Sequence, residues 1–200
     1  MSGTTPTKGN LMALHRTLAL ARMGYELMDR KRNILIREMM RLIDAAAELQ
    51  SRIDNTFAEA YKALQTANIA LGVCGDLAKN MPVDHSAQIR FRSVMGAELP
   101  SVAADSSPPS APPGFLPTNA DFDKAAGHFF KVKRLVTEMA EVETSIYRLA
   151  YAVKKTQKRA NALQNRIIPG LESSVKRIMG SLEEKEREEF VRMKVIKTRG

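Results

Sequence analysis

The stretch LIREMMRLIDAAAELQSRI at residues 35–53 has an apolar residue at alternating steps of four and three. In an α-helix this 3.5-residue spacing places these side chains along one seam, the arrangement by which two helices pack into a coiled coil. The stretch therefore predicts a helix that packs lengthwise against a second helix. The six seam positions are Leu35, Met39, Leu42, Ala46, Leu49 and Ile53.

The same spacing extends in both directions, from Leu11 to Ala70, and only Arg32 and Thr56 interrupt it with polar side chains. Residues 8–80 contain no proline, which would break a helix. The pattern predicts one helix over most of residues 1–80. At 1.5 Å per residue, such a helix is on the order of 100 Å long.

A second seam runs through residues 119–200 and predicts another helix of similar length. Two successive steps of four, from Ile167 to Val175, form a stutter that relaxes left-handed supercoiling. Pro169 lies within this pattern and is expected to bend the helix, because it lacks a backbone donor. The seam residues expected at the helix–helix interface are Leu18, Leu35, Leu42, Leu49, Ile53, Met139, Ile146, Val153, Leu163 and Ile167.

The middle segment, residues 81–118, differs from both helices. Residues 88–95 read QIRFRSVM, in which apolar and basic side chains alternate as in a short strand. Gly96 and Ala97 are expected to turn the chain, so that residues 98–102 return as a second strand. Residues 106–117 hold five prolines and three serines and predict a loop.

These segments predict a mainly α fold with two very long helices in an antiparallel intrachain coiled coil, joined by a short β-hairpin and a Pro-rich loop. A parallel coiled-coil homodimer is the alternative. The interruption favours the intrachain arrangement, because a continuous dimer has no use for a hairpin and a loop between its helices.

The sequence shows no catalytic, cofactor-binding or metal-binding pattern. It contains no phosphate-binding Gly-x-x-x-x-Gly-Lys-Ser/Thr string. His15, His85 and His128 are scattered and lack a metal-ligand partner at helical spacing. The single cysteine, Cys74, excludes an intrachain disulfide and is interpreted as a core residue. We therefore expect a protein that is not an enzyme and that needs no cofactor.

The net charge of +9 comes mainly from residues 121–200, which hold 18 basic and 11 acidic side chains. The basic stretch 131–166 matches no recognised nucleic-acid-reading module, so an acidic protein surface is the favoured target and no nucleic acid is expected. No apolar run resembles a leader or a membrane span. We expect a cytoplasmic protein that meets the membrane only through partners.

Two blocks near the chain ends carry a family resemblance. The first is PTKGNL at residues 6–11, and the second is KRANALQNRIIP at residues 158–169, followed by EEKEREEFVRMKVIK at residues 183–197. Together they resemble the D subunit of V-type and archaeal-type rotary ATPases. The hairpin residues Val94 to Gly96 fit the short central hairpin of prokaryotic members, whereas the Pro-rich insert is not part of the family pattern.

The resemblance implies a central-stalk rotor shaft present as one copy per complex. It implies partners in the catalytic and non-catalytic A and B subunits of the ring, in the F subunit, and in the membrane-rotor coupling subunit (C/d). The expected contacts with the head ring are Leu11, Met12, Val191, Arg192, Met193, Lys194, Ile196 and Lys197.

With the F subunit, the expected contacts are Ile89, Phe91 and Val94, although packing against the chain's own helices explains these residues equally well. A non-rotary coiled-coil scaffold or tether is the alternative function. It accounts for the seams but not for the two terminal blocks.

Overall fold

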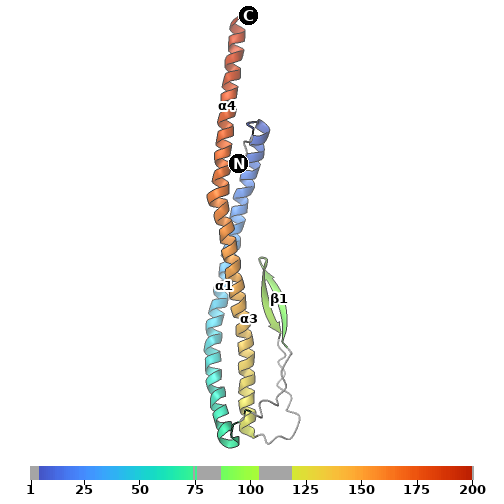
Figure 1. Cartoon of the computed structure of the whole chain (residues 1–200), viewed down its shortest axis with the longest axis vertical. Coiled ribbons are helices and arrows are strands. Elements are labelled where there is room, and N and C mark those ends of the chain that lie inside the picture. The colour runs from blue at the N-terminus through green and yellow to red at the C-terminus, as the bar shows by residue number, and fades with distance from the viewer. Residues whose placement is uncertain (1–4, 74, 76–86, 104–118, 200) are drawn as a thin grey trace. The chain divides into compact units, whose positions relative to one another are not determined.

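The chain is mainly helical, with a short β-hairpin between its long helices (Figure 1), as the two seams predicted. The computed structural model describes residues 5–73, 75, 87–103 and 119–199. The Pro-rich stretch 106–117 therefore lies outside the described residues, as do Cys74 and His85. The elements are α1 (Lys8–Leu71), β1 (Gln88–Val94), β2 (Ala97–Ala103), α3 (Ala120–Ala162), the π-helical turn η1 (Leu163–Ile167) and α4 (Ile168–Arg199).

Helix α1 has a recognisable capping residue at each end. At its start, the Asn10 N–H lies 3.3 Å from the Thr7 hydroxyl oxygen, so this threonine satisfies a free donor of the first turn. At its end, Gly72 has a φ of 78° and its N–H donates to the Asn68 carbonyl at 2.9 Å. Glycine enters this left-handed region without a steric penalty. The helix thus ends at Leu71, before the predicted end near residue 80. The prediction relied on the absence of proline, but a glycine with positive φ can also end a helix.

The chain divides into two compact units, one made of Met1–Asn33 with Val153–Gly200 and the other of Ile34–Ala152. In each unit a segment of α1 packs against a segment of the second helical stretch. No helix within the described ranges is both long enough and apolar enough to cross a membrane.

In the first unit the packed helices run antiparallel. Lys8 at the start of α1 pairs with Glu186 at 2.9 Å, and Arg22 pairs with Glu172 at 2.7 Å. The partner number falls as the α1 number rises, which defines the opposite chain direction. Both ion pairs are exposed, so apolar burial supplies most of the stability here. The buried apolar residues of this unit are Leu18, Ala160, Val175 and Ile178.

Arg32, the polar residue that interrupts the first seam, is held by a polar cluster. Its guanidinium lies 2.6 Å from the Asp29 carboxylate and donates to the Gln157 side-chain oxygen at 2.7 Å. The Gln157 amide donates in turn to Asn161 at 2.8 Å. A polar contact within a seam is satisfied in only one register, so this cluster favours one alignment of the two helices.

The predicted disturbance near Pro169 takes the form of the π-helical turn η1. The Ile168 N–H donates to the Leu163 carbonyl, five residues back. This turn accommodates one extra residue and changes the phase of the following helix. Ile167, predicted as a seam residue, is consequently 43% exposed, while Val175 and Ile178 are buried further along. Leu163 remains half-buried, and its Cδ1 would lie 3.9 Å from a Cβ added at Gly24.

In the second unit, the core follows the predicted seam closely along α1. Leu35 is fully buried, and Leu42 is 8% exposed. On α3, however, some of the most buried positions are residues that the prediction left out, including Val132 and the polar Ser145. Two apolar clusters connect α1 and α3. The first has Leu49, Ile53 and Leu135 at its centre, with Phe57, Met139 and Val142 packed against them. The second consists of Ala67 and Phe122, with Leu71 packed against them.

The hairpin also belongs to the second unit. Met95 (φ 50°) and Gly96 (φ 75°) form its two-residue turn, as in a type I′ turn, which matches the twist of the flanking strands. The sequence had suggested that Ala97 is part of the turn. In the structure Ala97 is instead the first residue of β2. Leu99 is fully buried and anchors the hairpin.

Candidate functional site

The last part of α4 extends beyond its partner helix. Lys8, the first residue of α1, contacts Glu186, and α4 continues from there to Arg199 (Figure 1). We call residues 187–198 the C-terminal tail. Every one of these residues is exposed. The tail is therefore a single helix with no described element packed against it.

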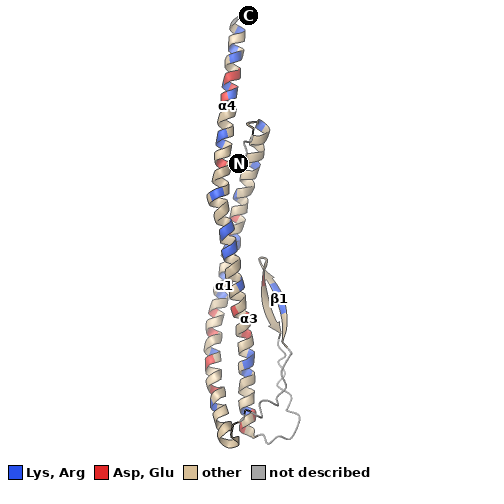
Figure 2. Cartoon of the chain, in the orientation of Figure 1, with Lys and Arg blue, Asp and Glu red and all other residues tan. Residues whose placement is uncertain are grey.

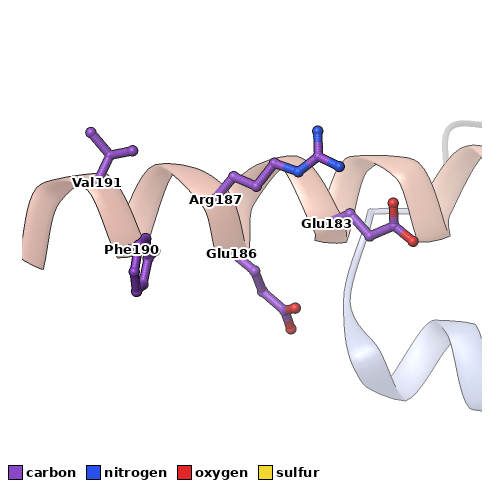
Figure 3. A pocket seen from close by; sticks show the side chains of 5 residues that line it. All are labelled: Glu183, Glu186, Arg187, Phe190 and Val191. Carbon is purple, nitrogen blue, oxygen red and sulfur yellow. The ribbon is translucent and has the colours of Figure 1, made fainter. Parts of the chain in front are cut away.

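The tail nevertheless carries large apolar side chains. Exposure of this amount of apolar surface on a helix is typical of a contact site for another protein. Glu186 and Phe190 project from the same side of α4 beside a shallow recess, whose lining also includes Glu183, Arg187 and Val191 (Figure 3). The exposed apolar residues of the tail are Phe190 (65%), Val191 (58%), Met193 (64%), Val195 (45%) and Ile196 (72%).

The charge of α4 changes sign as the helix enters and runs through the tail (Figure 2). Residues 183–189 contain five glutamates, whereas residues 190–200 contain no acid. Arg192 lies 4.0 Å from Glu188, and no ion pair within the described residues engages Lys194 or Lys197. Exposed cations on an apolar helix end fit an acidic rim around an apolar socket.

The predicted ring-contact residues thus lie together on the tail, apart from two at the start of α1. There, Met12 is 62% exposed and Leu11 is half-buried.

Sequence reasoning missed a second apolar stripe on α1. Leu20, Met23 and Leu27 are 64%, 53% and 61% exposed, and steps of three and four separate them. At 100° per residue they lie on the helix face opposite the buried Leu18. Their spacing was visible in the sequence, but the seam pattern on the other face was stronger and concealed it.

The hairpin presents the residues predicted for the F subunit in an exposed setting. Ile89 is 64% exposed, Phe91 is 59% exposed and Val94 is half-buried. Within the hairpin, Leu99 is fully buried, although sequence reasoning did not single it out as a core residue. Ile89 and Phe91 are therefore available for contact with another protein.

Helix α3 holds the hairpin through its second strand. The Val102 N–H donates to the Glu141 carboxylate at 2.7 Å, and Arg148 donates to the Glu98 carbonyl at 3.1 Å. The Arg148 guanidinium also lies 5.3 Å from the centroid of the Phe91 ring, a cation–π distance. Both hydrogen bonds from α3 thus reach the backbone of β2, and β1 is the strand farther from them.

Among the described residues, no group of three or more His, Cys, Asp or Glu side chains is arranged to hold a metal ion. His15 is exposed on α1, and the His128 Nδ1 lies 3.7 Å from the Glu59 carboxylate on the neighbouring helix.

Fold and surfaces together define a mainly helical protein, built from paired antiparallel helices, whose exposed apolar side chains suit contact with other proteins. The chain belongs to the family of ATP synthase D subunits, because the model of that family matches residues 10–198.

Its relatives share this description over nearly their full lengths. The chain is 44% identical to the D subunit of the V-type ATP synthase of Thermotoga neapolitana over 194 residues, which cover 96% of each chain. It is 35% identical to the D subunit of the A-type ATP synthase of Thermococcus kodakarensis over 197 residues, covering 96% of this chain and 92% of the relative. The corresponding A-type protein of Methanosphaera stadtmanae is 33% identical over 202 residues, covering 98% of this chain and 94% of the relative. The chain is accordingly part of a multisubunit V-type or A-type ATP synthase.

Proposed function

We propose that this chain is the central-stalk rotor shaft of its complex, present in one copy and not itself catalytic. It transmits torque between a head ring of A and B subunits and the ion-translocating rotor in the membrane, which it meets through the coupling subunit (C/d). The ions are protons or sodium, and the torque serves ATP synthesis or hydrolysis. The shaft works at the cytoplasmic face of the membrane.

The observation that carries this proposal is the exposed C-terminal tail beside the start of α1. A shaft must reach into its ring beyond the paired helices, and the tail provides a single helix that does so from its contact with Lys8 onward. Its apolar residues supply burial, and Lys194 and Lys197 supply long-range attraction to an acidic wall. The stripe on α1, made of Leu20, Met23 and Leu27, adds exposed apolar surface on the paired part of the unit.

Packing between the helices suits torque transmission. The antiparallel helices of each unit are joined by buried apolar residues, and close-packed side chains resist relative sliding. The polar cluster at Arg32 adds resistance to slippage, because a shifted register would leave its partners without hydrogen bonds. The F subunit is proposed to bind at the exposed hairpin residues Ile89 and Phe91.

Direct observation of rotation tests the proposal. The variant Cys74→Ser with Ile69→Cys provides one attachment point, because Ile69 is 87% exposed near the end of α1. The complex is assembled with the A, B and F subunits, the ring is fixed to a surface, and a bead is attached to the introduced cysteine. We expect ATP-dependent rotation of the bead in one direction.

Two controls sharpen the result. A bead on the ring of the same preparation must stay still. Truncation after Glu189 removes the apolar tail but leaves the Lys8–Glu186 contact, and it should preserve helix pairing while weakening ring binding or torque. A complex that hydrolyses ATP while the bead on this chain remains stationary would exclude the shaft and favour a static scaffold or tether.

A further inference from the structure

The two edges of the hairpin differ in their contacts with the rest of the chain. In a hairpin with a two-residue turn, the flanking residues, here Val94 and Ala97, exchange hydrogen bonds, and the paired positions then alternate in direction. The pairs whose backbone N–H and C=O groups point away from the partner strand are Ser93 with Glu98, Phe91 with Pro100, and Ile89 with Val102.

The outer edge of β2 is covered by side chains of α3 at two of its outward backbone groups. Its Glu98 carbonyl accepts a hydrogen bond from Arg148, and its Val102 N–H donates to Glu141. Pro100, between them, has no N–H to offer. These contacts agree with the alternation derived from the turn, and they block this edge to any further strand.

The outer edge of β1 has no such cover. Six of its seven residues are exposed, and no hydrogen bond within the described residues reaches the outward backbone groups of Ile89, Phe91 or Ser93. Proteins protect open edges with prolines, inward charges or covering elements, as β2 demonstrates here. On β1, two of the residues whose backbone groups point outward are the apolar Ile89 and Phe91, which are 64% and 59% exposed.

We propose that β1 accepts a strand from a second protein of the complex, converting the hairpin into a three-stranded antiparallel or mixed sheet. This inference rests on the proposed function, in which the hairpin binds the F subunit, and it adds the mode of binding. Main-chain hydrogen bonds along an open edge provide affinity, and alternate side chains provide specificity.

The chemistry of β1 describes the strand that fits it. Ile89 and Phe91 lie on one face of the hairpin, and Arg90 and Arg92 lie on the other. Arg92 lies 3.5 Å from Glu38, whereas Arg90 is exposed and makes no ion pair within the described residues. The incoming strand should therefore alternate apolar residues, packed beside Ile89 and Phe91, with an acidic residue beside Arg90.

Residue-specific amide hydrogen exchange, followed by NMR, tests the proposal on the full chain alone and in complex with the F subunit. In the chain alone, the amides of Ile89, Phe91 and Ser93 should exchange faster than the inward amides of Arg90 and Arg92. In the complex, these three amides should slow by roughly tenfold or more, the protection expected from one added hydrogen bond of ordinary strength.

A matched pair of variants tests the backbone contribution. Ser93→Pro removes one outward N–H, and Pro100 already occupies an equivalent outward position on β2, so the hairpin can retain its own ladder. We expect Ser93→Pro to weaken binding of the F subunit by about tenfold, while Ser93→Ala, which keeps the N–H, leaves it unchanged. Equal binding by both variants would overturn the proposal.

The remaining outcomes separate this inference from the proposed function. A complex that forms while the three outward amides stay fast would exclude strand addition and leave the shaft intact. Failure to form any complex with the F subunit or the ring would overturn both proposals. Protection that appears in the chain alone and rises with its concentration would identify a second copy of this chain as the occupant, contradicting a strand from another protein.

Discussion

The Nζ atom of Lys8, the first residue of α1, lies 2.9 Å from the Oε1 atom of Glu186 on α4. This contact marks the last point at which the two helices touch through an ion pair, and it defines where the C-terminal tail begins. The hydrogen bond to Glu186 and its negative charge raise the pKa of the Lys8 ammonium above its ordinary value of 10.5.

The pH dependence of this contact has a definite sign. Because the pKa of Lys8 is raised in the folded state, its stabilising contribution is present below pH 10.5 and is lost as the pH rises through the folded-state pKa. We expect Glu186→Gln to return the Lys8 pKa toward 10.5, measured by NMR titration of the lysine side chain. An unchanged pKa would show that the contact does not persist in solution.

Two leucines eight residues apart on α1 should respond in opposite ways to truncation. Leu35 is fully buried, so Leu35→Ala should lower the free energy of unfolding by about 2–5 kcal/mol. Leu27 is 61% exposed, so Leu27→Ala should leave stability nearly unchanged but weaken binding to the ring. Chemical denaturation followed by circular dichroism measures the first effect, and native mass spectrometry of the assembled head measures the second. Similar unfolding curves for the two variants would contradict the burial difference.

The π-helical turn should survive removal of the proline that follows it. Reversion to a regular α-helix would rotate α4 by about 100° and pull Val175 and Ile178 out of the interface. Exposing these two side chains costs roughly 3–6 kcal/mol, more than the ~1 kcal/mol regained from one backbone hydrogen bond.

Pro169→Ala should therefore keep η1, as seen from its backbone chemical shifts. Deletion of Gln164 should instead convert the turn to α-helix while Val175 and Ile178 stay buried. If Pro169→Ala alone straightened the turn, the proline and not the packing phase would be its cause.

Two glycines should give opposite effects when replaced by alanine. Gly127 lies within α3, and an added Cβ would meet nothing within 4 Å, so Gly127→Ala should stabilise the chain by about 1 kcal/mol. Gly72 has a φ of 78°, which strains any residue with a Cβ, so Gly72→Ala should destabilise it by ~1 kcal/mol. Thermal unfolding of the two variants beside the parent chain provides the measurement, and a shift of the same sign in both would refute the assignment of the helix end.

Along α1 the core was predictable because one helix face carries nearly all the buried positions. Leu18, Leu35, Leu42, Leu49 and Ile53 are all buried, as their 3.5-residue spacing indicates. On the second helical stretch the prediction was less complete. Met139, Ile146 and Val153 are only half-buried, whereas Ser145 is buried, and the pattern of apolar residues could not reveal a buried serine hydroxyl group.

For the predicted contact residues, the structure gives their exposure but not their partners. Their exposure on the tail and at Ile89 and Phe91 makes them accessible, and their roles stay predictions until the complexes are measured. The sequence showed that β1 alternates apolar and basic residues, yet it contained no information about which hairpin edge α3 would cover. That choice depends on Glu141 and Arg148, which lie about 40 to 50 residues away in the chain.

The sequence by itself determined the two long helices, their apolar faces, the hairpin and the family, because heptad spacing, glycine and proline act over a few residues along the chain. Tertiary structure alone decided that Ile167 leaves the seam, that α3 covers one strand and leaves the other open, and that the tail begins at the Lys8–Glu186 contact. Each of these features depends on how two distant segments are aligned. Alignment is set by the summed packing of many side chains, which no local pattern contains.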